Sequence, residues 1–321
     1  ERRGCRMTPE EQRVAATTDC RSIIREKSKS FAMASKLLPA SSRDDVITLY
    51  AWCRRADDAI DMVPEAEQPA AIQKLSSEIE SLYAGQAQVE PVLQLFQSVV
   101  QKYQIPKEYP LELIAGMQMD ADGMRYQTLH ELLLYCYRVA GVVGLMLCHI
   151  LGVRNKTALS QAAHLGIAMQ LTNIARDVAE DWARARLYIP HEWLTAQVQA
   201  PELHVLVPSD VQAALKPQIQ RLLDLADAYY SSADRGIPAL PYRAALAVAA
   251  ARRVYSAIGA EIRAAVFDVF SGRIYVSNLR KLWLCGVAIV STTLAFVRLP
   301  SSRGVPRFNL PVKAVEDVIY L

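Results

Sequence analysis

Apolar residues recur every three or four positions along most of this chain, as residues 132–151 and 219–228 illustrate. This spacing places apolar side chains on one face of an α-helix, whereas a half-buried strand would alternate apolar and polar residues. Short clusters of Pro, Gly and polar residues interrupt the pattern, and between them we expect helices of about 15 to 25 residues. None of these breaks is long enough to be an interdomain linker. The pattern therefore predicts an all-α protein.

One predicted helix begins near residue 41, where the sequence Ser-Ser-Arg-Asp-Asp (residues 41–45) is typical of an N-cap followed by an acidic first turn. The second half of this helix carries a polar stripe. Its four members follow positions i, i+4, i+7 and i+11, and we therefore expect them on one helix face: Tyr50, Arg54, Asp57 and Asp61.

A second polar stripe crosses an otherwise apolar helix in the other half of the chain. Its members occupy positions i, i+3, i+7 and i+11: Gln170, Asn173, Asp177 and Asp181. Burying such a stripe is unfavourable unless its polar groups have partners. Two matching stripes therefore favour a functional site, although a lone pair of acids at this spacing is usually a solvated helix face.

Each stripe ends in two aspartates that project from one helix face, one turn apart. Their carboxylates repel each other, so they stabilise nothing in a purely structural helix. A divalent cation between them would reverse that balance. Mg²⁺ that is held by carboxylates and keeps open coordination positions can bind a substrate that carries phosphate. The sequence therefore predicts a cation site between two facing helices.

Composition narrows the class of protein further. The chain has 321 residues, of which 52% are hydrophobic, so it can bury a large core. Its formal net charge of +3 is small and no basic run is interleaved with aromatic residues, so we expect no nucleic-acid partner. The six cysteines have no CxxC spacing and are typical of reduced, mostly buried thiols in a cytoplasmic protein. The five histidines are scattered, which argues against zinc.

The C-terminal region contains sixteen residues without a charge, 282–297, flanked by Arg280, Lys281 and Arg298. This stretch is shorter than the roughly 20 residues that span a bilayer. Two interpretations remain open. The segment is either a buried terminal helix or an interfacial helix that docks on a membrane, which the basic flanks would assist.

Four motifs in order give the chain a family resemblance. They are Ser-Lys-Ser-Phe at 28–31, Leu-Tyr-Ala-Trp-Cys-Arg-Arg-Ala-Asp-Asp at 49–58, Tyr-Cys-Tyr-Arg-Val-Ala-Gly-Val-Val-Gly at 135–144, and the segment 170–190. With these motifs the chain resembles the head-to-head prenyl synthases of the squalene and phytoene synthase family, bacterial type. The resemblance covers residues 28–273, most of the chain.

The resemblance implies an isoprenoid synthase fold: a single large helical domain around a central cavity. We expect that catalytic domain over residues 21–298. A poorly ordered or vector-derived N-terminus is expected over residues 1–20, and a flexible tail over residues 299–321.

The resemblance also implies roles for individual residues. Tyr50 and Arg54 join the four aspartates as catalytic residues. The implied metal ligands are Asp57, Asp61, Asn173, Asp177 and Asp181. The implied substrate and diphosphate contacts are Ser28, Ser30, Tyr50, Arg54, Gln170, Arg176, Arg186, Tyr188, Tyr255 and Arg273. Tyrosine faces can stabilise a cation, and Tyr135 is a further candidate for that role.

The implied activity is that of a prenyltransferase in carotenoid biosynthesis. Two geranylgeranyl diphosphates condense head to head to phytoene through a cyclopropylcarbinyl diphosphate, and two diphosphates are released. The alternatives are a C30 enzyme that makes dehydrosqualene or squalene from farnesyl diphosphate, and a non-catalytic scaffold of the same fold. Mg²⁺ is the expected cofactor, with Mn²⁺ as a substitute, and NADPH is not expected. We expect a cytoplasmic protein with peripheral contact to the inner face of the membrane.

Two further hypotheses concern the cavity. Ser35 and Ile47 are expected at its floor, where a small side chain would leave room for a C20 tail. Gly141 and Gly144 mark either a helix kink over the cavity or a close approach between helices.

Overall fold

The structure, a computed structural model, describes residues 9–27, 29–153, 158–195, 198, 200–298 and 319. These residues form helices and no β-strand, so the predicted all-α class is confirmed. The α-helices are α1 (Pro9–Lys27), α2 (Lys29–Ser35), α3 (Ala40–Asp61), α4 (Gln68–Tyr83), α5 (Pro91–Tyr103), α6 (Glu108–Ala121), α7 (Leu129–Cys136), α8 (Val142–Leu151), α9 (Ala158–Ala183), α10 (Ser209–Asp234), α11 (Tyr242–Ala264) and α12 (Asn278–Arg298). Short 3₁₀ turns lie at Glu65–Glu67, His191–Trp193 and Ile237–Ala239, and a π-helical turn at Tyr137–Gly141 joins α7 to α8.

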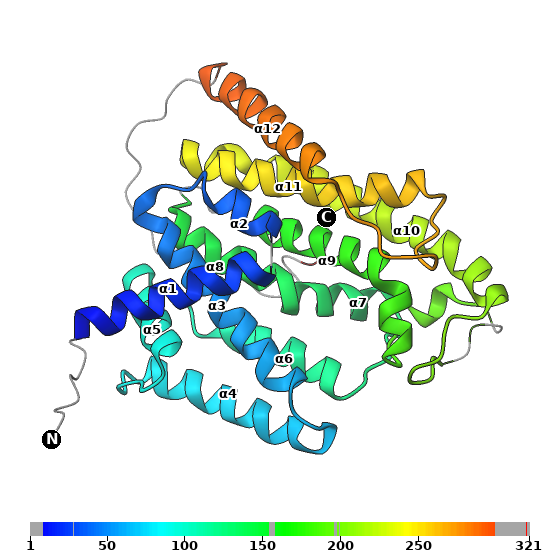
Figure 1. The fold of residues 1–321 in the computed structure, drawn as a ribbon, viewed down its shortest axis with the longest axis horizontal. Coiled ribbons are helices and arrows are strands. Elements are labelled where there is room, and N and C mark those ends of the chain that lie inside the picture. Colours follow the sequence, from blue (N-terminus) through cyan, green and yellow to red (C-terminus); the bar gives the residue numbers. More distant parts are fainter. Residues whose placement is uncertain are drawn as a thin grey trace, which may run out of the picture.

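Helix α9 runs through the middle of the molecule, with α10 and α11 packed along one side and α8 along another (Figure 1). Its length allows it to contribute both to the apolar core and to the predicted polar stripe. Leu159, Ile167 and Leu171 are fully buried in the main core. Helix α9 therefore has a buried apolar face and a partly buried face that carries the stripe.

Glycines allow α8, α9 and the π-helical turn to approach closely. A Cβ at Gly144 would collide with the carbonyl oxygen of Ala162, and a Cβ at Gly166 with that of Ala140. The predicted close approach between helices is confirmed at Gly144, and a π-helical turn ends at Gly141. Such turns insert one extra residue into a helix and often occur at functional sites.

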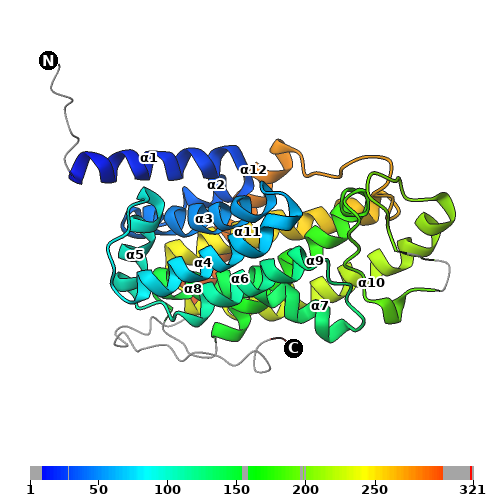
Figure 2. The same ribbon diagram turned by 90° about the horizontal axis from the view of Figure 1, so that it is seen from below.

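Helix α1 packs across α3 and α5 at the outer edge of the fold (Figure 2). Cys20 and Ile24 of α1 are buried against Ile47 of α3. Because Ile47 faces α1, the prediction that it lies at the cavity floor is wrong. The N-terminal boundary also differs from the expectation: residues 9–20, predicted to be poorly ordered, are helical, whereas residues 1–8 lie outside the described part of the chain.

The predicted N-cap of α3 is wrong as well. The helix begins at Ala40, after Pro39, and no side chain caps it. Asp44 instead pairs with Arg21 of α1, with 2.7 Å between Oδ1 and Nη2. Asp45 accepts hydrogen bonds at 2.7 Å from the ammonium group of Lys102 and from the hydroxyl of Tyr103, both on α5. These acids tie α3 to its neighbours across the fold.

Helix α12 lies along one edge of the molecule, on top of α11 (Figure 1). Only its inner face is buried, where Ala288 packs on Ala249 and Ala250. The interpretation of residues 282–297 as a buried helix is therefore wrong. By length and composition alone, residues 129–151 and 278–297 could each cross a membrane; 56% of the first window but 11% of the second is buried in the protein. The predicted tail at 299–321 falls outside the described residues except for Ile319, which is buried.

Candidate active site

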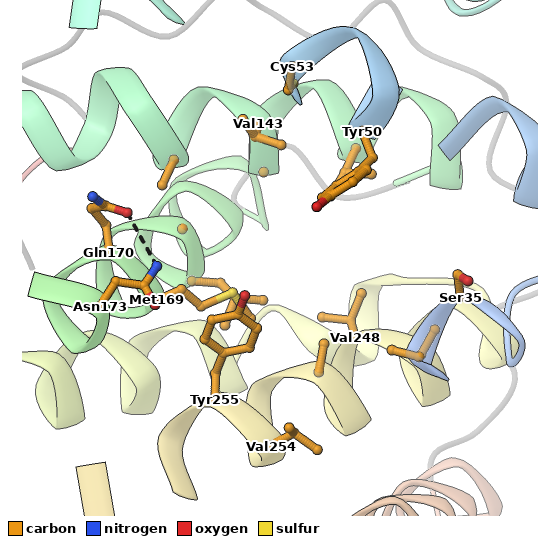
Figure 3. A pocket seen from close by; sticks show the side chains of 18 of the residues that line it. Ser35, Tyr50, Cys53, Val143, Met169, Gln170, Asn173, Val248, Val254 and Tyr255 are labelled. Carbon is orange, nitrogen blue, oxygen red and sulfur yellow. Dashed lines mark hydrogen bonds between the residues drawn. The ribbon is translucent and has the colours of Figure 1, made fainter. Parts of the chain in front are cut away.

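A cavity of about 650 Å³ lies between α2, α3, α8, α9 and α11. Most of its wall is apolar, formed by side chains such as Leu49, Val143, Leu165 and Val248. Figure 3 shows these walls closing around the space from opposite sides. A cavity of this size is within the usual range for small-molecule sites. Its apolar walls suit a hydrocarbon chain, and they would keep water away from a reactive cation.

The two predicted polar stripes meet at one end of the cavity. Figure 3 shows Tyr50 of α3 and Tyr255 of α11 projecting from opposite walls, with Gln170 and Asn173 of α9 on the side of Tyr255. The amide of Asn173 donates to the side-chain oxygen of Gln170 at 3.5 Å. Seven of the predicted site residues line the cavity, which places them together in space: Tyr50, Arg54, Gln170, Asn173, Arg176, Tyr255 and Arg273.

The predicted aspartates stand one turn beyond these residues, toward the C-terminal ends of α3 and α9, and arginines cover some of them. Arg54 approaches Asp57 with 3.0 Å between Nη1 and Oδ2, and it also pairs with Asp58. On the other helix, Arg176 donates from Nε to Oδ1 of Asp177 at 2.7 Å. These forks are the groups that bind phosphate oxygens well, so the same arginines can exchange a carboxylate for a diphosphate.

Arg273 adds a third cation from the loop that precedes α12. Its Nη1 donates to Glu180 of α9 at 3.1 Å, and its Nη2 lies 3.5 Å from Asp177. Arg273 is half exposed and lines the cavity. By contrast, Arg55 next to Arg54 pairs with Glu78 of α4 at 2.8 Å and belongs to the structural framework of the fold.

Two of the carboxylates, Asp57 and Asp181, lie in an environment that disfavours their charge. Burial, followed by the neighbouring Asp61 carboxylate, raises the pKa of Asp57 to about 6. Burial, followed by Asp177, raises the pKa of Asp181 to about 7. Two acids with raised pKa values, one on each helix, are the arrangement that a bound cation would stabilise.

The oxygen atoms of these aspartates fit Mg²⁺ ions that are shared with a bound diphosphate. No three Asp, Glu, His or Cys side chains among the described residues converge on a single point that could hold an ion. Mg²⁺ commonly takes only one or two carboxylates from the protein and completes its shell with substrate phosphates and water. Asp57 and Asp61 on one helix, and Asn173, Asp177 and Asp181 on the other, are residues that would hold such ions once a diphosphate is present. Their hard oxygen atoms match this cation class.

A further carboxylate, which the sequence analysis missed, lies close enough to both acid helices to act on their aspartates. Asp120 in the last turn of α6 influences the pKa values of both Asp57 and Asp181. It accepts hydrogen bonds from the hydroxyls of Tyr135 at 2.7 Å and Tyr188 at 2.8 Å. The signal was present in the sequence: Asp120 continues the buried α6 stripe of Leu113 and Met117 at i, i+4 and i+7.

Tyr188 and Arg186 occupy this acid end and do not line the cavity wall. The charge of Arg186 interacts with Asp120 and Asp61, and it lowers the pKa of Asp181. Arg186 is therefore placed to bridge the two acid helices electrostatically, within reach of a diphosphate bound between them.

The far end of the cavity includes two small side chains, Ala34 and Ser35. Ser35 lines the cavity there, as predicted, together with Ala34 and Leu38 (Figure 3 shows Ser35 opposite Asn173). The Ser35 hydroxyl donates to the carbonyl oxygen of Ala32 at 2.9 Å, so this polar group is satisfied without a ligand. Val46 takes the place predicted for Ile47.

Two predicted substrate contacts, Ser28 and Ser30, lie just before these small residues. Ser28 lies outside the described residues. Ser30 is in the first turn of α2, the helix whose last two residues line the cavity. Their predicted role in substrate binding stays a prediction.

Comparison with known proteins agrees with this geometry. The model of the squalene/phytoene synthase family matches residues 24–280. The chain is 39% identical to a phytoene synthase from Rhodobacter capsulatus, with 85% of this chain and 81% of the relative covered. It is 40% identical to a 15-cis-phytoene synthase from a Paracoccus species, with 89% and 94% covered.

Among solved structures, a dehydrosqualene synthase in complex with a ligand is similar, with a TM-score of 0.80 and 30% identity over 89% of this chain and all of that one. A squalene synthase from Alicyclobacillus acidocaldarius has a TM-score of 0.70 and 26% identity over 81% and 97% of the two chains. The chain belongs to the squalene/phytoene synthase family and has the isoprenoid synthase fold. It is a prenyltransferase-type enzyme of a family that uses prenyl diphosphates and generally depends on divalent metals.

Proposed function

We propose that the protein condenses two geranylgeranyl diphosphates head to head to phytoene. The observation that carries this proposal is the cavity itself, which is apolar over most of its wall and is lined by three arginines, two of which pair with the aspartates that lie one turn beyond. A prenyl diphosphate has the same polarity, with a long hydrocarbon tail and an anionic head. The curated relatives at 39–40% identity are phytoene synthases, which supports the same assignment.

The polar residues of the cavity have two roles in this reaction, binding of the diphosphate and stabilisation of the cation. Arg54, Arg176 and Arg273 would bind diphosphate oxygens, and Gln170 lies beside them. Bound Mg²⁺, or Mn²⁺ in its place, would supply charge stabilisation for the departing diphosphate. The tyrosines at the polar end, Tyr50 and Tyr255, can stabilise an allylic cation with their ring faces.

The reaction proceeds in two balanced halves. In the first, one C–O bond breaks with its electron pair leaving on diphosphate, the allylic carbon is attacked by the alkene of the second molecule, and proton loss closes a cyclopropane. In the second, the remaining C–O bond ionises, the cyclopropylcarbinyl cation rearranges, and a second proton is lost. No electrons enter from outside, so this product needs no NADPH.

The rival assignment is an enzyme that makes a C30 product from a shorter prenyl diphosphate, because the dehydrosqualene synthase structure is also similar. The two assignments differ in the length of the substrate tail. The small side chains of Ala34 and Ser35 at the far end favour the longer C20 tail. A bulky side chain there would shorten the cavity, so side-chain volume at this end separates the two substrates.

The assignment is tested by incubating the purified protein with geranylgeranyl diphosphate and Mg²⁺, followed by extraction and mass spectrometry. Parallel arms contain EDTA, farnesyl diphosphate, or NADPH. We expect a C40 hydrocarbon that disappears with EDTA and is unaffected by NADPH. A C30 product from the farnesyl arm alone would move the assignment to dehydrosqualene or squalene. Folded protein without product from either substrate would indicate the non-catalytic scaffold.

We also propose that the protein lies on the cytoplasmic face of a membrane through α12. The exposed side of this helix is a continuous apolar stripe: Leu279, Leu282, Trp283, Val290, Leu294 and Val297, each more than half exposed. No acidic residue interrupts the helix, and Lys281 near its start also lines the cavity. Because its other face packs on α11, α12 fits a position at the lipid surface better than one across the bilayer.

Binding to lipid is measured by flotation with anionic and with neutral vesicles. Trp283 is 65% exposed whereas Trp52, Trp182 and Trp193 are buried, so a blue shift of the tryptophan emission would report on α12 itself. We expect Leu294→Ser to weaken binding to anionic vesicles. Leu206→Ser is a matched control, because Leu206 is 85% exposed on a different surface. Equal flotation of both variants and the unaltered protein would contradict the proposal.

A further inference from the structure

The carboxylate of Asp120 has an unusual pair of partners. Its Oδ2 accepts the hydroxyl of Tyr135 at 2.7 Å, and its Oδ1 accepts the hydroxyl of Tyr188 at 2.8 Å. One tyrosine comes from α7 and the other from the segment after α9, 53 residues apart in the chain (188 − 135). A single side chain of α6 thus fixes the hydroxyl direction of two residues from separate elements.

The three groups form a closed cluster. The rings of Tyr135 and Tyr188 stack with their centroids 5.1 Å apart and their planes 23° from parallel. Tyr126 covers both rings, with centroid distances of 5.3 Å and 6.0 Å. All three tyrosines are almost fully buried. Among the described residues, the Tyr126 hydroxyl has no hydrogen-bond partner, so Tyr126 packs against the cluster without joining its hydrogen bonds.

The cluster lies at the acid end of the cavity. Asp120 interacts electrostatically with Asp57 and Asp61 of α3 and with Asp181 of α9, and Arg186 balances part of this negative charge. Burial raises the pKa of Asp120, and the two tyrosine hydrogen bonds act in the opposite direction. Positive charge would develop next to this region as a diphosphate departs.

We propose that Asp120 is a positioning residue for the reaction, and that it acts through Tyr135 and Tyr188. A carboxylate that accepts a hydrogen bond from a phenol increases the electron density of the phenol oxygen and fixes the direction of its proton. Neither tyrosine lines the cavity, so the effect on a developing cation is electrostatic: the fixed phenol oxygens and the Asp120 carboxylate lie near Arg186 at the acid end, where the diphosphate would depart. This inference rests on the proposed function, in which a cation develops near the cluster.

The decisive variant is Asp120→Asn, which keeps the shape of the side chain. An asparagine accepts from one tyrosine with its oxygen but donates from its NH₂ group to the other, whose proton must then turn elsewhere. We expect kcat to fall by about 10- to 100-fold while KM for the prenyl diphosphate and the Mg²⁺ requirement change by less than about threefold. Tyr126→Phe is the matched control, because it removes a buried hydroxyl that has no partner, and its kcat should stay within about twofold.

A double-variant cycle separates positioning from mere packing. Tyr135→Phe should cost less in kcat when Asp120 is already asparagine, because the bond between them is then disturbed. Tyrosines labelled with ¹³C at Cζ supply a readout without turnover, since their shifts report the hydroxyl hydrogen bond. We expect the two signals of Tyr135 and Tyr188 to move in Asp120→Asn, and that of Tyr126 to stay in place.

Three results would overturn the inference. One is an Asp120→Asn enzyme with unaltered kcat, and another is a pair of losses that simply multiply. The third is a loss confined to KM or to the Mg²⁺ requirement, which would make Asp120 part of the metal site. Failure of the proposed function would look different, since the unaltered protein would then form no C40 product whatever the NMR signals show.

Discussion

The negative charges of Asp57 and Asp181 destabilise the folded protein when no metal is bound. Each has a pKa in the folded protein above the unfolded value, about 6 and about 7 respectively. Between the unfolded and the folded pKa the native state binds more protons than the unfolded chain, so stability falls as pH rises through this window. In the metal-free protein these two groups therefore favour folding at pH 5 over folding at pH 8.

Replacing Asp181 with asparagine should stabilise the protein and inactivate it. At pH 8 and without metal, Asp181→Asn removes a buried negative charge next to Asp177, so we expect Tm to rise by about 1–3 °C. Turnover should fall at least about 100-fold, because a predicted metal ligand is lost. Differential scanning calorimetry and the product assay measure the two effects.

The control for Asp181→Asn is Glu202→Gln, an exposed acid in the loop before α10. It should change neither Tm nor turnover. The gain in Tm for Asp181→Asn should shrink as the pH is lowered to 5, where Asp181 of the unaltered protein is already protonated. A variant that is less stable than the unaltered protein at pH 8 would contradict the prediction.

Ser35 sets the length of the cavity if the far end is where the substrate tail stops. Ser35→Phe would place a large ring among Ala34, Leu38 and Val46, so we expect preference to move from the C20 toward the C15 diphosphate, by about tenfold in relative kcat/KM. Competition between the two substrates, analysed by product mass, measures this ratio. Ser35→Ala should behave as the unaltered enzyme, and unchanged selectivity of Ser35→Phe would reject the idea.

Single residues also show where prediction from sequence stops. Tyr50, Arg54, Gln170 and Asn173 could be predicted, because helical spacing alone places each stripe on one face, and the structure brings both stripes to one cavity. The position of Ile47 could not be predicted, because its neighbour Val46 is only about 100° away around the helix. The position of α1 decides which of the two side chains faces the cavity.

At the scale of the helix, the close contact between α8 and α9 depends on glycine. Gly144→Ala would place a methyl group against the carbonyl oxygen of Ala162, so backbone must move, and we expect a loss of about 1–3 kcal/mol in the free energy of unfolding. Chemical denaturation measures this loss. Gly144 also lines the cavity, so turnover should fall in parallel.

Gly286 on α12 is the matched control for Gly144. A methyl group there meets nothing within 4 Å, so Gly286→Ala should stabilise the helix slightly through its better helix propensity. If Gly144→Ala were as stable as Gly286→Ala, the tight packing of α8 on α9 would be contradicted.

Helix existence was predictable from periodicity, whereas helix ends and local departures were not. Local chemistry favours a first helical turn at the acids 44 and 45, but their partners Arg21 and Tyr103 belong to other helices. The π-helical turn at Tyr137–Gly141 changes the register of α7 and α8 by one residue without any signal beyond its glycine. Asp120 is an intermediate case: its place on the buried stripe of α6 is visible in the sequence, but its partners Tyr135 and Tyr188 come from other elements.

At the scale of the whole molecule, α12 begins at the cavity and continues along the exposed surface. The loop residues 273–276 and Lys281 line the cavity, and α12 continues from them with its apolar stripe exposed. A C40 hydrocarbon is insoluble in water, so its release into solvent would be slow and could limit turnover. A lipid surface under α12 would accept the product directly.

Anionic vesicles should therefore speed multiple turnovers by several-fold and leave a single turnover unchanged, because only product release is affected. Rapid quench at enzyme excess measures the single turnover, and steady-state product formation measures the rest. Trp283→Ser combined with Leu294→Ser should lose the stimulation, while Leu206→Ser, altered on a different surface, should keep it. If vesicles accelerated the single turnover as well, lipid would act on the chemistry or on substrate entry. If the double variant were stimulated as strongly as the unaltered enzyme, α12 would not be the surface through which the product leaves.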